Sequence, residues 1–310
     1  MSPTKPRNAL SELSTQLADA VETAARSVVA IHARRRIPSS GIMWRDDVIV
    51  SASHTVQRDE EIPVTLPSGE TARVAIAGRD PATDLVALRL KGARWPVAPR
   101  AGAGSLRVGA PVLAVGRPGR EVSASFGIIS AVREGWRTWR GTRLDRVLRL
   151  DLNVYDGFSG GPLVDASGAV LGIDNSALAR GTPLALPGAE VDRVLEQLLE
   201  RGHVRRAFVG IAVQPVALGA KIIAKHALPA ETALVVVSVA DGSPAEVAGV
   251  AVGDVLIDAA GTPFEHATDL LDALAAVPEG GSLAIKRLRG GAIGTVSVAP
   301  ADRAAGGGPA

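Results

Sequence analysis

The chain has 310 residues, of which 46% are hydrophobic and 21% charged. This length and composition predict a soluble protein with two or three compact units, because single hydrophobic cores stop growing at about 250–300 residues. The 34 basic and 32 acidic residues leave a net charge of +2, which gives no sign of nucleic-acid binding. Since the chain has no cysteine, structural disulfides, thiolate metal sites and a cysteine nucleophile are excluded.

The N-terminal region lacks the features of a secretory signal. Polar residues, among them Ser11, Glu12 and Asp19, interrupt the region that follows Met1–Leu10, so no apolar segment forms. No apolar stretch in the chain is long enough to cross a membrane. As written, the sequence predicts a cytoplasmic protein without a membrane span. A shortened N-terminus would leave room for a periplasmic or other extracytoplasmic location.

Residues 1–26 are expected to form an N-terminal segment with a lead-in helix, because apolar residues recur at helical spacing from Leu10 onward. From residue 27 to 187, short apolar runs alternate with glycine, proline and polar turns, which is typical of an all-β region. The expected strands are Ser27–Ala33, Asp47–Ala52, Glu61–Leu66, Ala72–Ala77, Leu85–Leu90, Pro111–Val115, Phe126–Val132, Val147–Leu152 and Ala169–Ile173.

Helical spacing returns at Ala189–Glu200, which predicts a linker helix over residues 188–203. A further unit is expected over residues 204–300, with a helix at Ala267–Ala276. Its expected strands are Val209–Val213, Ala233–Val239, Val255–Ala259, Ser282–Leu288 and Gly294–Val298. The small residues of 301–310 predict a disordered tail.

The stretch DGFSGGPL, Asp156–Leu163, indicates a serine nucleophile at Ser159. Flanking glycines let the backbone turn until its N–H groups converge, so the Gly157 and Ser159 N–H groups would form an oxyanion hole. The alternative is a glycine-rich turn with an incidental serine, but the strand, turn and strand that follow disfavour it. The same residues fit the nucleophile elbow of α/β-hydrolases, which needs a helix after the serine, whereas a strand is expected here.

A candidate base and a candidate orienting acid precede this serine. His54 follows an apolar strand that ends in small residues, and His32 is interpreted as structural. Asp84 stands directly before an apolar strand, although a turn cap is the alternative role for it. Asp80 precedes a proline and is interpreted as a turn residue. The order His, Asp, Ser is that of the chymotrypsin triad, in which the acid orients the base and the base activates the serine.

The chain resembles the HtrA family of trypsin-like serine proteases. The resemblance is carried by His54, Asp84 and Ser159, and by three segments that match family strands and loops: Ser125–Ser130, Leu150–Leu163 and Leu171–Asn175. The resemblance covers residues 15 to 300. It implies a mainly β fold, with a chymotrypsin-like double β-barrel over residues 27–187. His54, Asp84 and Ser159 would lie between the barrels, and a linker helix and a PDZ domain would follow.

In the third unit, Phe208–Ile211 resembles the carboxylate-binding loop of PDZ domains. In that loop backbone N–H groups bind a peptide C-terminus, and the peptide adds to the sheet edge. The resemblance implies that peptide C-termini bind at Phe208, Val209, Gly210 and Ile211. A PDZ fold that serves packing alone is the alternative.

Phe158 departs from the family pattern, which has asparagine before the serine. Trypsin-type zymogens pair a new N-terminus with an aspartate at that position, so Phe158 argues against activation by cleavage and leaves the geometry of the oxyanion loop open. The short loop at Ala33–Ser40 argues against the long inter-subunit loop of cage-forming relatives. The resemblance implies a homotrimer.

No aspartate stands where trypsin has the carboxylate at the base of its pocket, and Asn153 takes that place. The substrate pocket is expected to contain Leu152, Asn153, Val154, Ile173, Asp174 and Asn175. This composition predicts cleavage after small or medium apolar residues. Asp151 or Asp174 reaching into the pocket is the open alternative.

The sequence therefore predicts a serine endopeptidase that acts on unfolded or misfolded proteins and peptides, in protein quality control, with no metal or cofactor. A catalytically silent peptide-binding scaffold of the same fold and an esterase are the alternatives. The arginines from Arg133 to Arg149, interleaved with Trp136 and Trp139, could bind nucleic acid. They are interpreted instead as a solvent-facing hairpin, so no nucleic-acid partner is expected.

Overall fold

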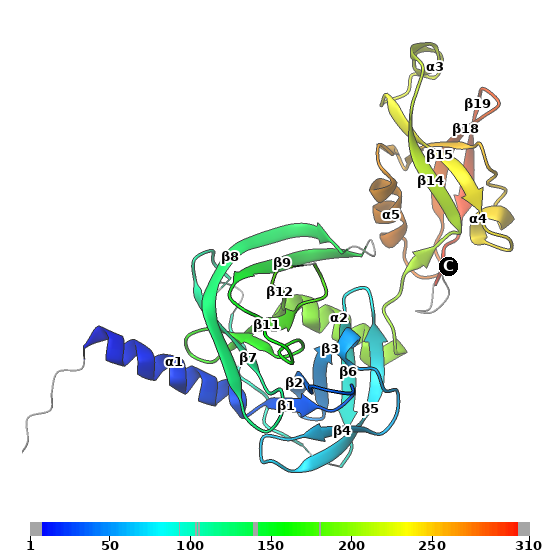
Figure 1. The fold of residues 1–310 in the computed structure, drawn as a ribbon. Coiled ribbons are helices and arrows are strands. Elements are labelled where there is room, and N and C mark those ends of the chain that lie inside the picture. Colours follow the sequence, from blue (N-terminus) through cyan, green and yellow to red (C-terminus); the bar gives the residue numbers. More distant parts are fainter. Residues whose placement is uncertain are drawn as a thin grey trace, which may run out of the picture. The chain divides into compact units, whose positions relative to one another are not determined.

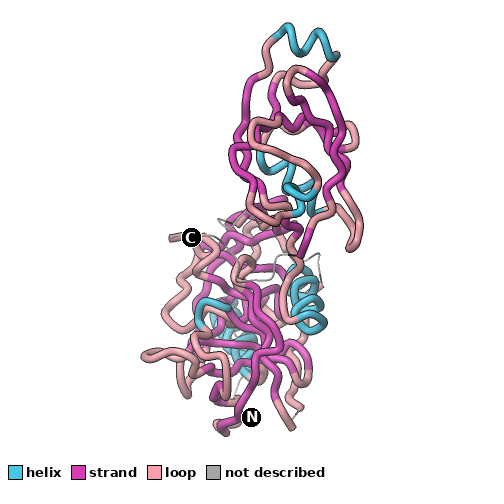
Figure 2. The backbone as a smooth tube through the Cα atoms, turned by 90° about the vertical axis from the view of Figure 1, so that its right-hand side faces the viewer, coloured by secondary structure: helices cyan, strands magenta, loops and turns pink. Residues whose placement is uncertain are grey.

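The computed structural model describes residues 8–302, apart from residues 93, 103, 105, 139–141 and 180. The chain divides into two compact units, Met1–Val204 and Arg205–Ala310. Strands dominate both units, as the ribbon in Figure 1 and the backbone trace in Figure 2 show. No helix in the described part of the chain is long and apolar enough to cross a membrane.

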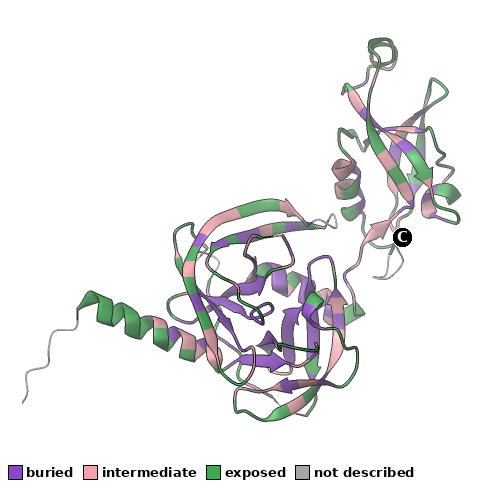
Figure 3. Ribbon diagram, viewed as in Figure 1, coloured by how far each residue is buried: buried purple, intermediate pink, exposed green. Residues whose placement is uncertain are grey.

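Helix α1 (Ala9–Ala25) precedes the first barrel, as predicted. It begins at Asn8, whose side-chain oxygen accepts a hydrogen bond from the Ser11 N–H group at 2.8 Å, as N-cap residues do. Ala20 and Ala24 in its second half are buried, whereas Leu10 and Leu13 in its first half are 76% and 43% exposed. Figure 3 shows that the N-terminal half of α1 is mostly exposed. The apolar stripe of α1 therefore extends beyond the surface that this chain itself covers.

The first barrel is closed by six strands in the order β1-β2-β3-β6-β5-β4. They are β1 (Val28–Ile31), β2 (Ser39–Arg45), β3 (Val48–Ala52), β4 (Ile62–Thr65), β5 (Thr71–Asp80) and β6 (Leu85–Leu90). Its core is aliphatic and includes Ile31, Ile49, Ile62 and Leu88. Strand β2 was absent from the prediction, because it begins with two serines and a glycine instead of apolar residues.

The second barrel is closed in the order β10-β11-β12-β9-β8-β7. Its strands are β7 (Pro111–Gly116), β8 (Ser123–Arg137), β9 (Arg143–Asp151), β10 (Pro162–Val164), β11 (Val170–Asn175) and β12 (Leu184–Pro187). Strands β8 and β9 are longer than predicted, because they continue as a hairpin of charged residues. The arginine-rich stretch lies in this hairpin, where Arg146 pairs with Glu134 at 2.9 Å. Trp139 and Arg140 lie outside the described residues.

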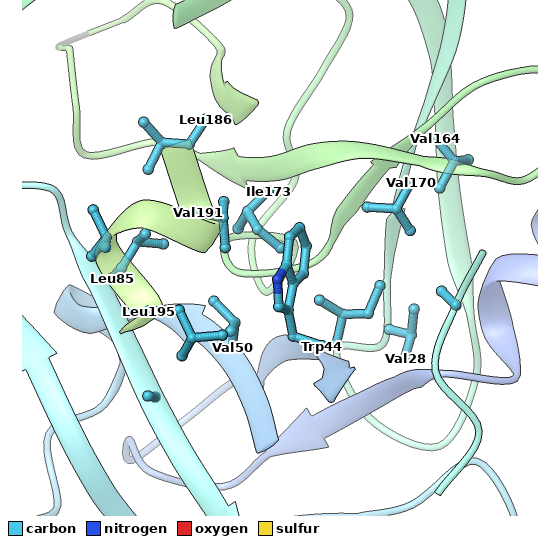
Figure 4. Packing of buried hydrophobic residues seen from close by; sticks show 14 of the residues in the cluster. Val28, Trp44, Val50, Leu85, Val164, Val170, Ile173, Leu186, Val191 and Leu195 are labelled. Atoms are coloured by element: carbon cyan, nitrogen blue, oxygen red, sulfur yellow. The ribbon is translucent and has the colours of Figure 1, made fainter. Parts of the chain in front are cut away.

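Helix α2 (Gly188–Arg201) packs on both barrels and completes the core between them. Val191 and Leu195 of α2 contact the cluster that contains Trp44 and Ile173 (Figure 4). The helix ends at Gly202, whose φ of +78° is the left-handed conformation of a helix C-cap. The predicted linker helix is thus part of the first compact unit.

A polar cluster ties α2 to the first barrel at the rim of this core. The Trp44 indole N–H donates to the Asp192 carboxylate at 2.7 Å. Arg100 donates to both Asp192 oxygens at 2.7 Å, and its guanidinium lies 4.3 Å from the centre of the Trp44 ring. The aspartate therefore joins three separate segments of the chain.

The second unit contains a sheet in the order β14-β15-β16-β18-β19, in which β14 is an edge strand and helix α5 lies along it. Phe264, Leu270, Leu274 and Ile285 belong to its core. The elements are β13 (Ala207–Phe208), β14 (Ile211–Ala217), α3 (Ala220–His226), β15 (Thr232–Val239), α4 (Pro244–Val247), β16 (Val255–Ala259), β17 (Thr262–Pro263), α5 (Ala267–Ala275), β18 (Leu283–Arg289), β19 (Ala292–Val298) and β20 (Ala301–Asp302).

The structure corrects the start of the predicted disordered tail. Ala301 and Asp302 form strand β20, which pairs with β13, and the Asp302 carboxylate accepts the Arg206 N–H at 3.1 Å. Backbone pairing needs no apolar side chain, so composition alone did not reveal it. Residues 303–310 lie outside the described residues. Helix α3 and strand β12 were also absent from the prediction.

We expect Asp192→Ala to lower the free energy of unfolding of the first unit by about 1–2 kcal/mol, because it removes charge-assisted hydrogen bonds that are only partly exposed. Tryptophan fluorescence in a urea titration measures this directly, since all 4 tryptophans precede residue 205. The control is Asp145→Ala, at an exposed strand residue. Equal effects of the two substitutions would contradict the stabilising role of Asp192.

Candidate active site

His54 and Asp84 lie side by side because the strands that carry them are paired. His54 lies in a short 3-10 helix, Ser53–Thr55, directly after β3, and Asp84 directly precedes β6, which pairs with β3. The His54 Nδ1 and Asp84 Oδ2 atoms are 2.6 Å apart, and the His54 backbone N–H donates to Asp84 Oδ1 at 2.7 Å. A carboxylate can only accept, so the proton is on Nδ1 and Nε2 is free to accept one.

The backbone of Asp84 adopts the left-handed conformation, with φ at +56°. Such a conformation is uncommon for a residue other than glycine and needs support from its surroundings. The Asp84 carbonyl accepts the Ser53 N–H at 2.9 Å and the Asn175 side-chain amide at 3.5 Å. The turn before it is held by Asp80, whose carboxylate accepts both the N–H and the hydroxyl of Thr83. Asp80 thus has the turn role expected from the sequence.

Ser159 lies in the loop between β9 and β10 of the second barrel. This loop packs against β2 and β3 of the first barrel. Gly160 makes this approach possible. A Cβ atom there would lie 2.3 Å from Ser51 Oγ and 2.5 Å from the Ser40 carbonyl oxygen, and its φ is +90°. Glycine is therefore required at this position for steric and conformational reasons.

The same loop presents two backbone N–H groups that have no hydrogen-bond partner in the described part of the chain, those of Gly157 and Ser159. The N–H group between them, on Phe158, donates to the Tyr155 carbonyl at 3.0 Å. The Gly157 carbonyl accepts the Ser40 hydroxyl at 2.6 Å, which holds the peptide in this orientation. Unpaired N–H groups on either side of a fixed peptide can donate to a developing oxyanion.

Phe158 is an apolar anchor of this loop. It is 1% exposed, and its ring meets the ring of Tyr155 edge to face at a centroid distance of 5.5 Å. It also lies on Gly116, where a Cβ atom would be 2.7 Å from the Phe158 ring. In place of the asparagine of the family pattern, Phe158 thus anchors the serine loop by burial of its ring.

The Ser159 hydroxyl makes its hydrogen bond with Ser176 Oγ, at 2.8 Å. No hydrogen bond joins Ser159 to His54 among the described contacts, so the structure brings histidine and aspartate together but turns the serine toward a different partner. Ser176 directly follows β11 and is exposed. Ser176 was not among the residues expected in the site, although it directly follows a strand that was expected to contribute to the substrate pocket.

The residues expected to line the pocket divide into two groups. Leu152 and Val154 are half-buried and Asn153 is exposed, so these three are accessible to a substrate. Ile173 and Asn175, also expected in the substrate pocket, are fully buried, so their side chains do not reach solvent. Ile173 belongs to the core between the barrels, and the Asn175 side-chain oxygen accepts the N–H groups of Ala177 and Leu178.

Asp174, the sixth expected pocket residue, is buried on β11 beside the serine loop. Its backbone N–H donates to the Gly161 carbonyl and its own carbonyl accepts the Gly160 N–H, both at 2.9 Å. Neither carboxyl oxygen has a hydrogen-bond partner. Burial raises the pKa of Asp174 well above its ordinary value, because an ionised carboxylate loses its hydration there. Burial therefore favours the neutral form of Asp174, and the side chain is closed off from solvent.

In the second unit, Phe208–Ile211 joins β13 to the edge strand β14. Gly210 has φ at +80°, and a Cβ atom there would lie 2.2 Å from the Ser243 Cβ. The carbonyls of Val209 and Gly210 accept N–H groups from the segment that contains α4. The loop is thus fixed at the end of an open sheet edge. Within the described residues, no group of three His, Asp or Glu side chains could hold a metal ion.

Comparison with known proteins agrees with this arrangement. The family model for the trypsin-like peptidase domain matches residues 39–173, and that for the PDZ domain matches residues 235–289. The chain is 30% identical over 268 residues to the "Probable periplasmic serine endoprotease DegP-like" of Chlamydia pneumoniae. This match covers 83% of this chain and 54% of the relative. It is 31% identical over 250 residues to the serine protease Do-like HtrB of Bacillus subtilis, with 74% and 55% covered. The chain spans about half the length of the curated relatives it matches.

Solved structures show the same architecture. The serine endoprotease from Yersinia pestis superposes with a TM-score of 0.74 at 26% identity, covering 98% of this chain and 100% of that one. The HtrA-type protease AlgW with a tripeptide gives a TM-score of 0.72 at 25% identity, covering 93% and 97%. The predicted fold class, a double β-barrel followed by a PDZ domain, is confirmed.

We expect Asp174→Asn to stabilise the protein increasingly as the pH rises. The unfolded chain releases the Asp174 proton above the ordinary pKa near 3.8, whereas the folded chain retains it, so folding of the wild type becomes less favourable with rising pH. The difference in unfolding free energy between Asp174→Asn and wild type should grow by up to about 1.4 kcal/mol for each pH unit above the ordinary pKa of aspartate. Urea titrations between pH 4 and 8 measure it, with Asp151→Asn at an exposed position as the control. A constant difference would show that Asp174 is ionised in the folded protein.

Proposed function

Because this chain belongs to the HtrA family of trypsin-like serine proteases, we propose that it is a serine endopeptidase that hydrolyses peptide bonds of unfolded or misfolded proteins. The observation that carries this proposal is the hydrogen-bonded His54–Asp84 pair, together with Ser159 on a loop whose Gly157 and Ser159 N–H groups are unpaired among the described residues. A role in protein quality control follows from substrates of this kind.

In the proposed mechanism, His54 Nε2 accepts the Ser159 proton as Oγ attacks the carbonyl carbon of the substrate. The Gly157 and Ser159 N–H groups donate to the oxyanion that forms. His54 then transfers the proton to the leaving amine, which breaks the peptide bond and leaves an acyl ester on Ser159. Water, deprotonated by His54, hydrolyses the ester. Asp84 holds the His54 tautomer and stabilises the imidazolium through the 2.6 Å contact.

The first step requires the Ser159 hydroxyl to leave Ser176 and turn toward His54. The hydrogen bond between the two serines stabilises the resting position by about 0.5–1.5 kcal/mol. Ser176 is exposed, so an incoming substrate or water can replace Ser159 as its partner. We infer that substrate binding favours the reactive position of the nucleophile.

Specificity for small or medium apolar residues before the scissile bond is part of the proposal. Its support is the accessible, half-buried pair Leu152 and Val154, together with the burial of Asp174, which raises the pKa of that carboxyl group. An ionised carboxylate at the base of the pocket would instead attract lysine or arginine. Asp151 lies exposed on β9 and is the remaining carboxylate to test by substitution.

The PDZ domain is proposed to bind peptide C-termini. The Phe208–Ile211 loop would donate backbone N–H groups to the terminal carboxylate, and the peptide would pair with the edge strand β14. The support is the fixed loop at an open sheet edge, with α5 alongside. Peptide capture at this domain would raise the local concentration of unfolded substrate.

A homotrimer is proposed as the assembly, on the strength of the family resemblance. The exposed Leu10 and Leu13 of α1 support self-association, because an apolar stripe on a helix gains stability when a partner covers it. Relatives described as periplasmic favour an extracytoplasmic location over the cytoplasmic one expected from the sequence. The silent scaffold is disfavoured by the intact His54–Asp84 pair.

The proposed function predicts that wild-type protein degrades casein. Ser159→Ala should lower the rate by several orders of magnitude, because nothing replaces the nucleophile. Ser167→Ala, in an exposed turn, is the matched control and should keep the wild-type rate. If the wild type is inactive even with C-terminal peptides added to occupy the PDZ domain, the scaffold function replaces the endopeptidase proposal.

The second prediction concerns the resting hydrogen bond. We expect Ser176→Ala to raise kcat/KM for a short apolar peptide, by up to about tenfold, because Ser159 loses the partner that holds it away from His54. Initial rates at low substrate concentration measure this, and Ser130→Ala on β8 is the control. A fall in kcat/KM would show that the Ser176 hydroxyl assists the reaction instead.

A further inference from the structure

A hollow of about 340 Å³ beside the oxyanion loop takes no part in the chemistry described above. It is lined by Arg34, Arg35, Arg36, Ile37, Gln57 and Asp156. We call it the arginine hollow. Three consecutive arginines in the lining of an open hollow near the serine loop suggest a binding role.

The walls of the arginine hollow are continuous with the active site on both sides. Ile37 and the following Pro38 lie against Gly157, where a Cβ atom would be 3.2 Å from Ile37 Cγ2 and 2.8 Å from the Pro38 carbonyl oxygen. Gln57 follows His54 by three residues, and its N–H donates to the Ala33 carbonyl at 3.2 Å. The hollow therefore extends between the oxyanion loop and the segment that carries His54.

This position determines which part of a substrate reaches the hollow. His54 gives its proton to the amine of the leaving half, so the residues after the scissile bond begin at His54 and continue over the surface next to it. The half of the substrate that leaves first is thus the half that meets Arg35 and Arg36. This step rests on the proposed endopeptidase function.

The lining of the arginine hollow has three positively charged side chains and one negatively charged side chain. Arg34 donates from Nε to the Ile37 carbonyl at 2.5 Å and stabilises the loop. Arg35 and Arg36 are exposed, and among the described contacts neither forms an ion pair or hydrogen bond. Asp156, the only acidic side chain in the lining, is not paired with any of the three. Two guanidinium groups are thus available, and the guanidinium fork matches the geometry of a carboxylate.

We propose that the arginine hollow binds acidic side chains of the substrate, so that the enzyme prefers Asp or Glu in the residues that directly follow the scissile bond. The hollow then adds a charge preference on the leaving side to an apolar preference on the other side. Exposed ion pairs are screened by salt, so the preference weakens as ionic strength rises.

The test uses two quenched fluorescent peptides that are identical up to the scissile bond and continue with either Asp-Glu or Asn-Gln. For the wild type we expect kcat/KM to be about threefold to tenfold higher for the acidic peptide at low salt, the range for one or two partly exposed ion pairs. In the double variant Arg35→Gln/Arg36→Gln the ratio should fall to about one. The control, Arg94→Gln/Arg107→Gln, removes the same charge at two exposed positions outside the hollow and should keep the wild-type ratio.

A second experiment measures the dissociation constants of the same peptides by fluorescence anisotropy. It uses Ser159→Ala protein with and without the Arg35→Gln/Arg36→Gln changes. The dissociation constants separate failure of the hollow from failure of the proposed activity, because they need no turnover. Tighter binding of the acidic peptide that disappears with the two arginines supports the proposal. Equal dissociation constants of the two peptides for the protein that keeps Arg35 and Arg36, or a preference that survives the Arg35→Gln/Arg36→Gln double substitution, overturn it.

Discussion

The carboxylate of Asp84 is held at both oxygens by one residue, and the arrangement of the site depends on that contact. His54 donates to it from its backbone and from its ring, so the imidazole cannot rotate without giving up a charge-assisted hydrogen bond. The left-handed backbone of Asp84 costs about 1–3 kcal/mol. The paired strands β3 and β6 and the Asp80 turn stabilise this conformation.

Contacts between the two barrels position the loop that carries Ser159. Gly160 allows the serine loop to approach the backbone of β2 and β3 more closely than any side chain would permit. Ser40 then joins the two barrels, because its hydroxyl donates to the Gly157 carbonyl and accepts the Arg117 N–H at 2.7 Å. The buried ring of Phe158 supports the same loop from the other side. Together these contacts fix the backbone that carries the Gly157 and Ser159 N–H groups, whereas the Ser159 hydroxyl is hydrogen-bonded to Ser176.

In the proposed function, three features of the chain would share substrate recognition. They are the accessible apolar residues Leu152 and Val154, the arginine hollow, and the open sheet edge of the PDZ domain. Burial raises the pKa of Asp174 and so favours loss of a charge that the sequence alone would count. Each part uses a different interaction, so each can vary without disturbing the His54–Asp84 contact.

The sequence by itself determined the strand-rich fold, the order of His54, Asp84 and Ser159, and the two glycine-dependent loops at Ser159 and Gly210, because these features are encoded in local patterns and short motifs. Only the tertiary structure decided that Ser159 rests on Ser176, that Ile173, Asp174 and Asn175 are buried, and that residues 301–302 form a strand. The physical reason is distance along the chain. Contacts such as Ser40 with Gly157, 117 residues apart, arise when the barrels close, and no local pattern of residue types contains them.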